Sequence, residues 1–316
     1  MFYLTHGKVI AVTMNPSIDK TIVIEHLVPY GLNRALSVRC DPGGKGINVA
    51  RVLKNLGADV TVFGLIAGEQ GKHLVNFLKS ADISADFIQN PGETRTNLKI
   101  FDQSTNKTTE INETGFDVTP EVLESFKRRF REIVREAEIV ILSGSLPPGI
   151  PEGFYRECIE IAKAQGAKSV LDADAGALSK GIRAVPYAVK PNLHELESLE
   201  GHPLSGRDEI VDAAQKLIDS GIEIVIVSMG PDGAIVMDRN EKYKVDSWDV
   251  EVKSATGAGD SMVAALSYSI LNNDSLLEMC KITTAAGTVT ASKEGTQICT
   301  WGEVMHSLQK VTATKI

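Results

Sequence analysis

Apolar and polar residues follow two different patterns along the chain. Short runs rich in Val and Ile, closed by Gly, Pro or Asn, predict buried strands. Between these runs, apolar residues recur every third or fourth position, as they do on one face of a helix. The predicted strands cover residues 8–13, 60–66, 138–142, 169–171, 188–189 and 222–228, and the predicted helices cover 47–56, 122–133, 212–220 and 261–271. This alternation indicates an α/β fold with a mostly parallel central sheet and helices on both faces.

Two stretches, 14–40 and 90–115, lack a helical stripe and carry Thr, Asn and β-branched residues instead. We interpret them as extra strands outside the main sheet, which form a small β-sheet lid over one edge. The chain shows no internal repeat, low-complexity run or linker. We therefore expect a single domain over residues 1–316, with the lid as part of it.

The composition excludes several classes of protein. The 316 residues are 43% hydrophobic and 23% charged, which is typical of a globular chain, and the net charge is −8. An acidic protein repels nucleic acid and anionic membranes, so we expect neither as a partner. No apolar run approaches 18 residues, residues 1–12 do not resemble a signal peptide, and the four cysteines lack metal-ligand spacing. These features favour a cytoplasmic protein with reduced thiols.

The sequence TGAGD at residues 256–260 directly precedes an apolar helix. Small residues at a helix start allow backbone N–H groups to converge on an anion. Asp260 would lie in the first turn, where its carboxylate could accept a proton from an alcohol while the N–H groups hold a transferring phosphoryl group. The alternative is a tight turn in which Asp260 only favours the helix dipole.

The sequence PGGKGIN at residues 42–48 opens the helix at 47–56 and differs from a P-loop in its spacing. Its glycines allow a ligand to lie against the backbone, Lys45 offers a positive charge, and Asn48 can donate to or accept from a hydroxyl. The alternative is a glycine-rich loop with a solvated lysine. Asp19, in the sequence NPSID at 15–19, could bind sugar hydroxyls or belong to an Asx turn.

Polar and glycine residues follow three further predicted strands, in SGSLPPG at 143–149, VKPNLHE at 189–195 and SMGPDGA at 228–234. Asn192 and Glu195 could position a hydrated Mg²⁺, or they could form a capping box at a helix start. The glycines after Ser228 either allow a nucleotide to approach or form a hairpin turn. The six histidines lack zinc-site spacing, and no G-x-S-x-G sequence indicates a hydrolase.

In this order, together with ETRTNLK at 93–99, the motifs resemble the phosphofructokinase B family of ribokinase-like sugar kinases, from about residue 9 to residue 296. The resemblance implies a three-layer α/β/α sandwich, a lid that builds a homodimer, and transfer of the ATP γ-phosphoryl group to a sugar. It is closest to the ketose-phosphate kinases, which implies fructose 1-phosphate as acceptor. Tagatose 6-phosphate is the alternative, and an unphosphorylated sugar or a nucleoside is a more distant one.

The resemblance also implies a role for individual residues. Asp260 would be the catalytic base, with an anion hole formed by residues 257–259, and Mg²⁺ would assist, with a monovalent cation as a further requirement in some relatives. The anion hole comprises Gly257, Ala258 and Gly259; the sugar phosphate would contact Asp19, Arg34, Gly43, Gly44, Lys45, Asn48, Arg95 and Ser145; ATP would contact Lys190, Asn192, Ser228, Gly230, Gly233, Ser254 and Thr256; and Asn192 and Glu195 would hold Mg²⁺, through water. The small apolar segment 285–292 would also lie near the nucleotide.

Two rival functions remain at this stage. A dinucleotide-dependent dehydrogenase lacks support, because position 262, where G-x-G-x-x-G requires glycine, is Met262. A catalytically silent sugar-phosphate sensor would not need an acid such as Asp260 beside the glycines.

Overall fold

The computed structural model describes residues 7–316. Its main sheet positions the site. Its strand order is β14 (Thr312–Lys315), β13 (Lys242–Asp246), β12 (Ala234–Met237), β11 (Ile224–Ser228), β10 (Ala188–Val189), β9 (Lys168–Asp172), β8 (Ala137–Ser143), β1 (Lys8–Thr13), β4 (Asp59–Ile66) and β5 (Ser84–Gln89). Within this sheet, the seven neighbouring strands β5, β4, β1, β8, β9, β10 and β11 run parallel to one another. The strands β12, β13 and β14 each pair antiparallel with the strand before them. The six predicted strands and the mostly parallel sheet are confirmed. The antiparallel edge was not predicted.

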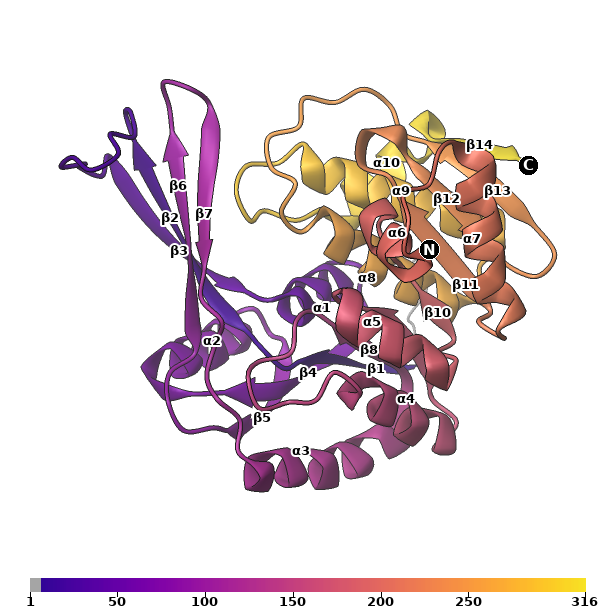
Figure 1. Ribbon diagram of the computed structural model, residues 1–316, viewed down its shortest axis with the longest axis horizontal. Helices are drawn as coiled ribbons and strands as arrows, with labels where there is room; N and C mark the ends of the chain where they lie inside the picture. The colour runs from indigo at the N-terminus through magenta and orange to yellow at the C-terminus, as the bar shows by residue number, and fades with distance from the viewer. Residues whose placement is uncertain (1–6) are drawn as a thin grey trace.

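Helices cover both faces of this sheet because its strands are apolar on both sides (Figure 1). Along β1, Val9 and Ala11 face one apolar cluster, whereas Ile10 and Val12 face the other. The first cluster includes α1 (Lys45–Asn55), α2 (Gly68–Ser80), α8 (Ala258–Asn272), α9 (Leu276–Ala291) and α10 (Trp301–Ser307). The second includes α3 (Pro120–Ile133), α4 (Phe154–Ala164), α5 (Ala175–Gly181), α6 (Leu193–Glu200) and α7 (Arg207–Asp219). The predicted three-layer α/β/α arrangement is therefore confirmed.

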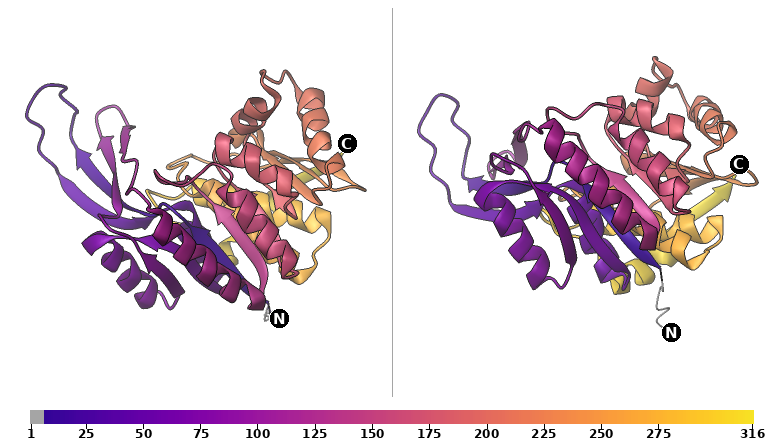
Figure 2. Two further views of the ribbon diagram at one scale, coloured as in Figure 1. Left: turned by 60° about the horizontal axis from the view of Figure 1, so that its bottom comes forward. Right: turned by 90° about the horizontal axis from the view of Figure 1, so that it is seen from below.

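A second sheet forms the lid, with the order β3 (Ser37–Gly43), β2 (Ser17–Ile24), β6 (Arg95–Asp102) and β7 (Lys107–Asn112). It projects away from the main sheet beside the C-terminal half of the chain (Figures 1 and 2). The prediction of lid strands within 14–40 and 90–115 is confirmed. Strand β3 continues to Gly43, because its last residues pair with the start of β2, so residues 41–43 are strand where a loop was expected.

The carboxyl ends of the parallel strands lie at one edge of the main sheet, which is where α/β proteins bind ligands. Five of these strands end in a polar residue or are directly followed by one: Thr13, Ser143, Asp172, Ser228 and, just after β10, Lys190. All five line one of two cavities. No helix among residues 7–316 is long and apolar enough to cross a membrane.

Candidate active site

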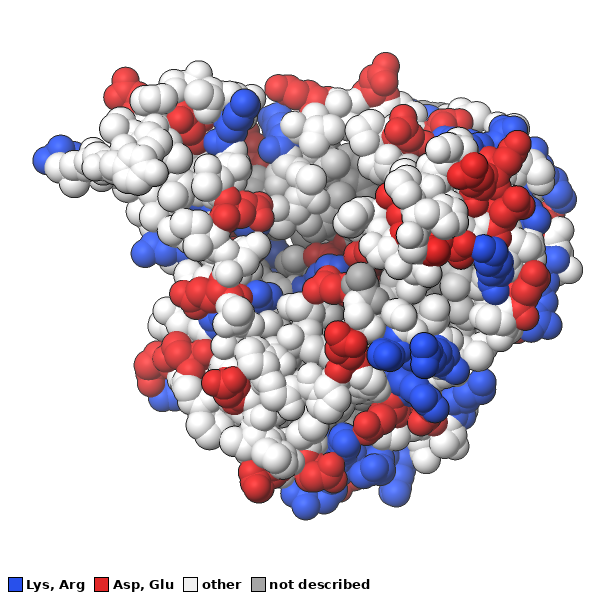
Figure 3. Space-filling view, in the orientation of Figure 1, with Lys and Arg blue, Asp and Glu red and all other residues white. Residues whose placement is uncertain are grey.

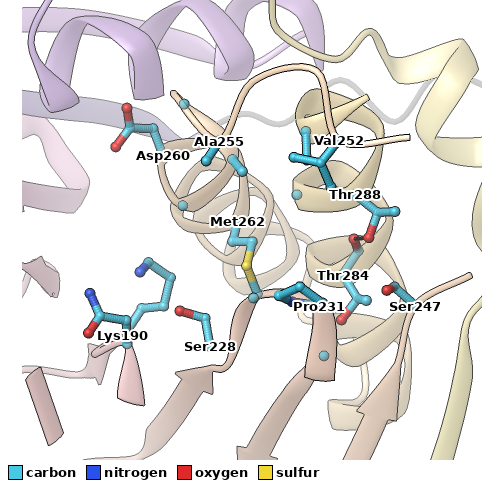
Figure 4. A pocket seen from close by; sticks show the side chains of 18 of the residues that line it. Lys190, Ser228, Pro231, Ser247, Val252, Ala255, Asp260, Met262, Thr284 and Thr288 are labelled. Carbon is cyan, nitrogen blue, oxygen red and sulfur yellow. Dashed lines mark hydrogen bonds between the residues drawn. The ribbon is translucent and has the colours of Figure 1, made fainter. Parts of the chain in front are cut away.

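The larger cavity, of about 560 Å³, lies between the ends of the strands and the helices α8 and α9. Figure 3 shows the surface hollowed between the lid and the rest of the molecule, with acidic and basic atoms at the floor of the hollow. In the close view of Figure 4, Asp260, Lys190 and Ser228 lie at one end of the cavity and Val252, Thr284 and Thr288 at the other. The cavity is therefore charged at one end and mostly apolar at the other.

Asp260 lies in the first turn of α8, as predicted, and its side chain is buried. Asn48 of α1 donates a hydrogen bond from Nδ2 to Oδ2 of Asp260, at 2.8 Å. Burial, and then the negative charge of Asp172, raise the pKa of Asp260 to about 6, while Asn48, Lys45 and Lys190 oppose the rise. A carboxylate with this pKa is ionised at neutral pH and still basic enough to accept a proton from an alcohol.

The turn before Asp260 contains the residues predicted to form an anion hole. Gly257 is the N-cap of α8 and has a φ of 81°, a conformation that favours glycine. Ala258 donates a long hydrogen bond of 3.4 Å to the carbonyl of Ala255, and the N–H groups that follow belong to the first turn, which has no partners within a helix. A Cβ atom at Gly259 would lie 3.6 Å from Nζ of Lys190, so a lysine ammonium lies beside these N–H groups.

A buried carboxylate organises two lysines at the charged end of the cavity. Asp172, at the end of β9, lies 3.3 Å from Nζ of Lys190 and 3.6 Å from Nζ of Lys45. Burial alone would raise the pKa of Asp172, but the two lysines outweigh it and hold the pKa below its usual value. Burial likewise opposes the charge of Lys45, but Asp172 and Asp260 dominate and raise its pKa. Lys45 is therefore held as a cation, and Asp172 places the side chain of Lys190 beside the predicted anion hole.

Asn192 and Glu195 are both parts of a capping box and residues that line the cavity. Oδ1 of Asn192 accepts from the backbone of Glu195 at 2.8 Å, and Oε2 of Glu195 accepts from the backbone of Asn192 at 2.9 Å. Burial raises the pKa of Glu195. The predicted capping box is thus observed; it uses Oε2 of Glu195, and the residue also lines the cavity. Within residues 7–316, no group of three or more His, Cys, Asp or Glu side chains could hold a metal ion by itself. A site with only a few oxygen donors fits Mg²⁺, because this ion usually keeps several of its water ligands.

The apolar end of the cavity is lined by several of the residues predicted to contact the nucleotide. Gly230 and Gly233 have positive φ angles in the hairpin turn between β11 and β12, which allows the backbone to approach a ligand. The predicted segment 285–292 contributes Gly287, Thr288 and Ala291. Further lining residues that the sequence reasoning did not single out are Pro231, Ser247, Val250, Val252, Met262 and Thr284.

The smaller cavity, of about 110 Å³, is lined by Lys45 and Arg95, two of the three side chains predicted to bind the acceptor phosphate. Arg95 enters it from the lid and is held by the carbonyl oxygens of Asn15, at 3.3 Å, and Glu113, at 2.9 Å. Ser145 lines the same cavity, and its Oγ accepts from Nδ2 of Asn15 at 3.4 Å. Lys45 lines both cavities, so the two are adjacent at this residue.

Other predicted residues lie outside the two cavity walls. Arg34 is in an exposed loop between β2 and β3 and lines neither cavity, so the structure does not bring it to the site. Asp19 and Gly43 lie side by side in the lid, where a Cβ atom on Gly43 would collide with Asp19. Gly44 precedes α1 with a φ of 108° and lines neither cavity. The predicted residues Ser254 and Thr256 flank Ala255, which does line the larger cavity.

Two carboxylates in the site escaped the sequence reasoning. Asp172 lines the larger cavity, and Asp174, 3.8 Å from Nζ of Lys45, lines the smaller one. Both follow the short predicted strand at 169–171. The rule that ligands bind at the carboxyl ends of parallel strands was a signal that could have found them.

Comparison with known proteins identifies the family of this chain. Residues 12–302 match the pfkB family carbohydrate kinases. A 1-phosphofructokinase of Xanthomonas campestris pv. campestris is 38% identical over 275 residues, covering 86% of both chains, and a 1-phosphofructokinase of Bacillus subtilis (strain 168) is 34% identical, covering 96% of this chain and 99% of its own. The structure of phosphofructokinase-2 from Escherichia coli in complex with potassium is 30% identical, with a TM-score of 0.90, over 96% of this chain and 98% of the other. The chain therefore belongs to the pfkB family of carbohydrate kinases.

Proposed function

We propose that this kinase transfers the γ-phosphoryl group of ATP to the free primary hydroxyl of a ketose monophosphate, with fructose 1-phosphate as its main acceptor and fructose 1,6-bisphosphate as product. The observation that carries this proposal is the shared wall at Lys45. The smaller cavity, with Arg95, suits the phosphate of the acceptor, and the larger one, with Asp260, suits ATP and the point of transfer. An acceptor seated across Lys45 would present its free hydroxyl to Asp260.

The residues of this chain would act mainly by position and charge. Asp260 accepts the proton of the acceptor hydroxyl, whose oxygen attacks the γ-phosphorus in line as the bond to the leaving ADP oxygen breaks. Backbone N–H groups of residues 257–259 donate to the transferring phosphoryl oxygens, and Lys45 and Lys190 place positive charge beside them. Asn48 holds the carboxylate of Asp260 in place.

Asn192 and Glu195 would hold Mg²⁺ through water. When bound, the ion neutralises charge on the ATP phosphates. We also infer that a monovalent cation is worth testing as an activator, because a related structure contains potassium.

The relatives named 1-phosphofructokinase favour fructose 1-phosphate over tagatose 6-phosphate. The test is the release of ADP from MgATP with fructose 1-phosphate, tagatose 6-phosphate and fructose 6-phosphate in parallel. We expect kcat/KM to be highest for fructose 1-phosphate. A lead for tagatose 6-phosphate would change the acceptor and keep the mechanism, whereas no activity with any of the three would contradict the phosphate-binding role of the smaller cavity.

We also propose that the lid builds a homodimer. Its exposed apolar side chains are typical of a surface that another copy covers. They are Val28, Tyr30, Leu32, Leu36, Val38 and Ile111. Sedimentation equilibrium of the wild-type chain and of the Leu36→Asp variant tests this proposal: we expect a dimer that the variant weakens, and a wild-type monomer at micromolar concentration would contradict it.

A further inference from the structure

Lys99 is a buried cation that the proposed transfer mechanism does not use. It lies on lid strand β6, in the motif ETRTNLK, and its side chain is only 11% exposed. Its Nζ lies 3.2 Å from Oδ2 of Asp19 and 3.2 Å from Oγ1 of Thr256. A buried lysine is costly unless its charge is paired, so this placement requires Asp19.

The two partners of Lys99 belong to different parts of the site. Asp19 is on lid strand β2, and its Oδ1 accepts from Ser17 at 2.9 Å and from Asn97 at 3.1 Å. With Lys99 on Oδ2, three donors fix this carboxylate in one orientation. Thr256 instead belongs to the loop that leads into the anion hole, directly before Gly257. Lys99 therefore connects the lid to the phosphate-binding loop through one side chain.

The chemistry of this bridge allows it to respond to ligands. A lysine ammonium has three donors, and within the described part of the chain two of them are engaged. The hydroxyl of Thr256 accepts from Lys99, so its own proton remains available to a phosphate oxygen. Lys99 thus lies between Asp19, a predicted sugar contact, and the loop at residues 256–259, the predicted phosphate contact.

We propose that Lys99 is a positioning residue that couples the binding of the sugar phosphate to the binding of ATP. The inference rests on the proposed function, because it takes Asp19 as a sugar contact and residues 256–259 as a phosphate contact. A sugar bound at Asp19 further stabilises this arrangement of Asp19, Lys99 and Thr256, in which the loop is already ordered to bind the nucleotide. By linkage, the nucleotide strengthens sugar binding by the same factor.

The test compares the dissociation constant of fructose 1-phosphate with and without a saturating non-hydrolysable ATP analogue and Mg²⁺, by calorimetry. We expect a ratio of at least about 5 for the wild type. The Lys99→Met variant should reduce this ratio to about 1, and Lys99→Arg should retain most of it. The matched control is Lys107→Met, because Lys107 is exposed on the neighbouring strand β7 and should leave the ratio unchanged.

A second variant keeps the test decisive if Lys99→Met does not fold. Thr256→Val removes the other end of the bridge without leaving a buried charge unpaired, and it should also reduce the ratio to about 1. In the double variant the two losses should not add, because they break one bridge.

Three outcomes would overturn the inference: a wild type that binds the two ligands independently, a Lys99→Met variant that keeps the ratio, or a folded Thr256→Val variant that keeps it. Independent binding by an enzyme that still phosphorylates fructose 1-phosphate would remove this inference alone. Absence of turnover with every ketose phosphate would remove the proposed function as well.

Discussion

The two cavities that meet at Lys45 are built by different means. At the charged end of the larger one, the groups that surround Asp260 are backbone N–H groups at the start of α8 and side chains anchored by the buried Asp172. In the smaller one, Arg95 enters from the lid and is held by loop carbonyl oxygens, while the exposed Asp174, at the start of α5, lies 3.8 Å from Nζ of Lys45.

We infer from this difference that the larger cavity carries out phosphoryl transfer and that the smaller one selects the acceptor. A centre fixed by helix geometry and buried charge needs little reorganisation when the reaction proceeds, which suits the transfer step. A pocket made of side chains from a lid and two loops can change its occupant by single substitutions, which suits the choice of acceptor. We therefore expect substitutions in the larger cavity to change kcat, and substitutions in the smaller one to change the KM of the acceptor.

The largest expected effect is that of Asp260→Asn. The amide keeps the size of the side chain but cannot accept the proton, so kcat should fall by about 10²- to 10⁴-fold, with both substrates still binding. Steady-state kinetics and calorimetry would measure the two quantities.

The stability of the same variant provides its control. Because the folded state raises the pKa of Asp260 from 3.8 to about 6, the ionised carboxylate makes the protein less stable as pH rises through that window. Asp260→Asn should therefore unfold at neutral pH with a free energy higher by on the order of 1–3 kcal/mol. A less stable variant would mean that its inactivity reports loss of fold.

The second prediction concerns Arg95→Met, which keeps much of the side-chain volume and removes the charge. The KM for fructose 1-phosphate should rise by about 30- to 100-fold, because a charge-assisted bond to a phosphate is lost, while the KM for ATP should change less than about threefold. Initial-rate kinetics with each substrate varied in turn would measure this. Equal increases in both KM values would contradict the separation of the two cavities.

The sequence predicted the turns and strands of this site better than the pairing of its charged side chains. The turn TGAGD and the start of α1 depend on local residue types, so Asp260 and Lys45 were found from the residues themselves, whereas Arg95 was found through the family resemblance. These three also lie at the cavity walls in the structure.

The remaining site residues depend on contacts between distant parts of the chain. Lys99 bonds to Thr256 across 157 positions, and Asn48 bonds to Asp260 across 212. Nothing near Lys99 distinguishes it from an exposed strand lysine, and its burial follows only from the closing of the lid on the loop. Asp172 and Asp174 were overlooked for a related reason: their roles depend on lysines that α1 and β10 bring to them.

The third prediction concerns pH. Because only the ionised carboxylate of Asp260 accepts a proton, kcat/KM should fall about tenfold for each pH unit below about 6. Asn48 stabilises the charged form by donating to it, so Asn48→Ala should raise this pKa and move the acid limb to higher pH. A pH–rate profile in buffers of constant ionic strength would show the shift. An acid limb that stays in place would mean that another group sets the profile.

The smallest expected effect is the most specific to the smaller cavity. Asp174 is the N-cap residue of α5, yet its side chain makes no capping hydrogen bond; its carboxylate lies 3.8 Å from Nζ of Lys45. It therefore competes with the acceptor phosphate for Lys45 and adds negative charge near Arg95, whose pKa burial lowers and Asp174 helps to raise. Asp174→Asn should lower the KM for fructose 1-phosphate by about 2- to 5-fold, within the range expected for exposed charges.

Inorganic phosphate separates this effect from a change in sugar contacts. It should inhibit the Asp174→Asn variant more strongly than the wild type, by a similar factor, since the variant gains affinity for the phosphate group itself. Asp208→Asn, on the exposed first turn of α7, is the matched control and should change neither value. If instead the KM rises and inhibition by phosphate stays the same, Asp174 binds a sugar hydroxyl, and the smaller cavity selects the acceptor by its hydroxyls as well as by its phosphate.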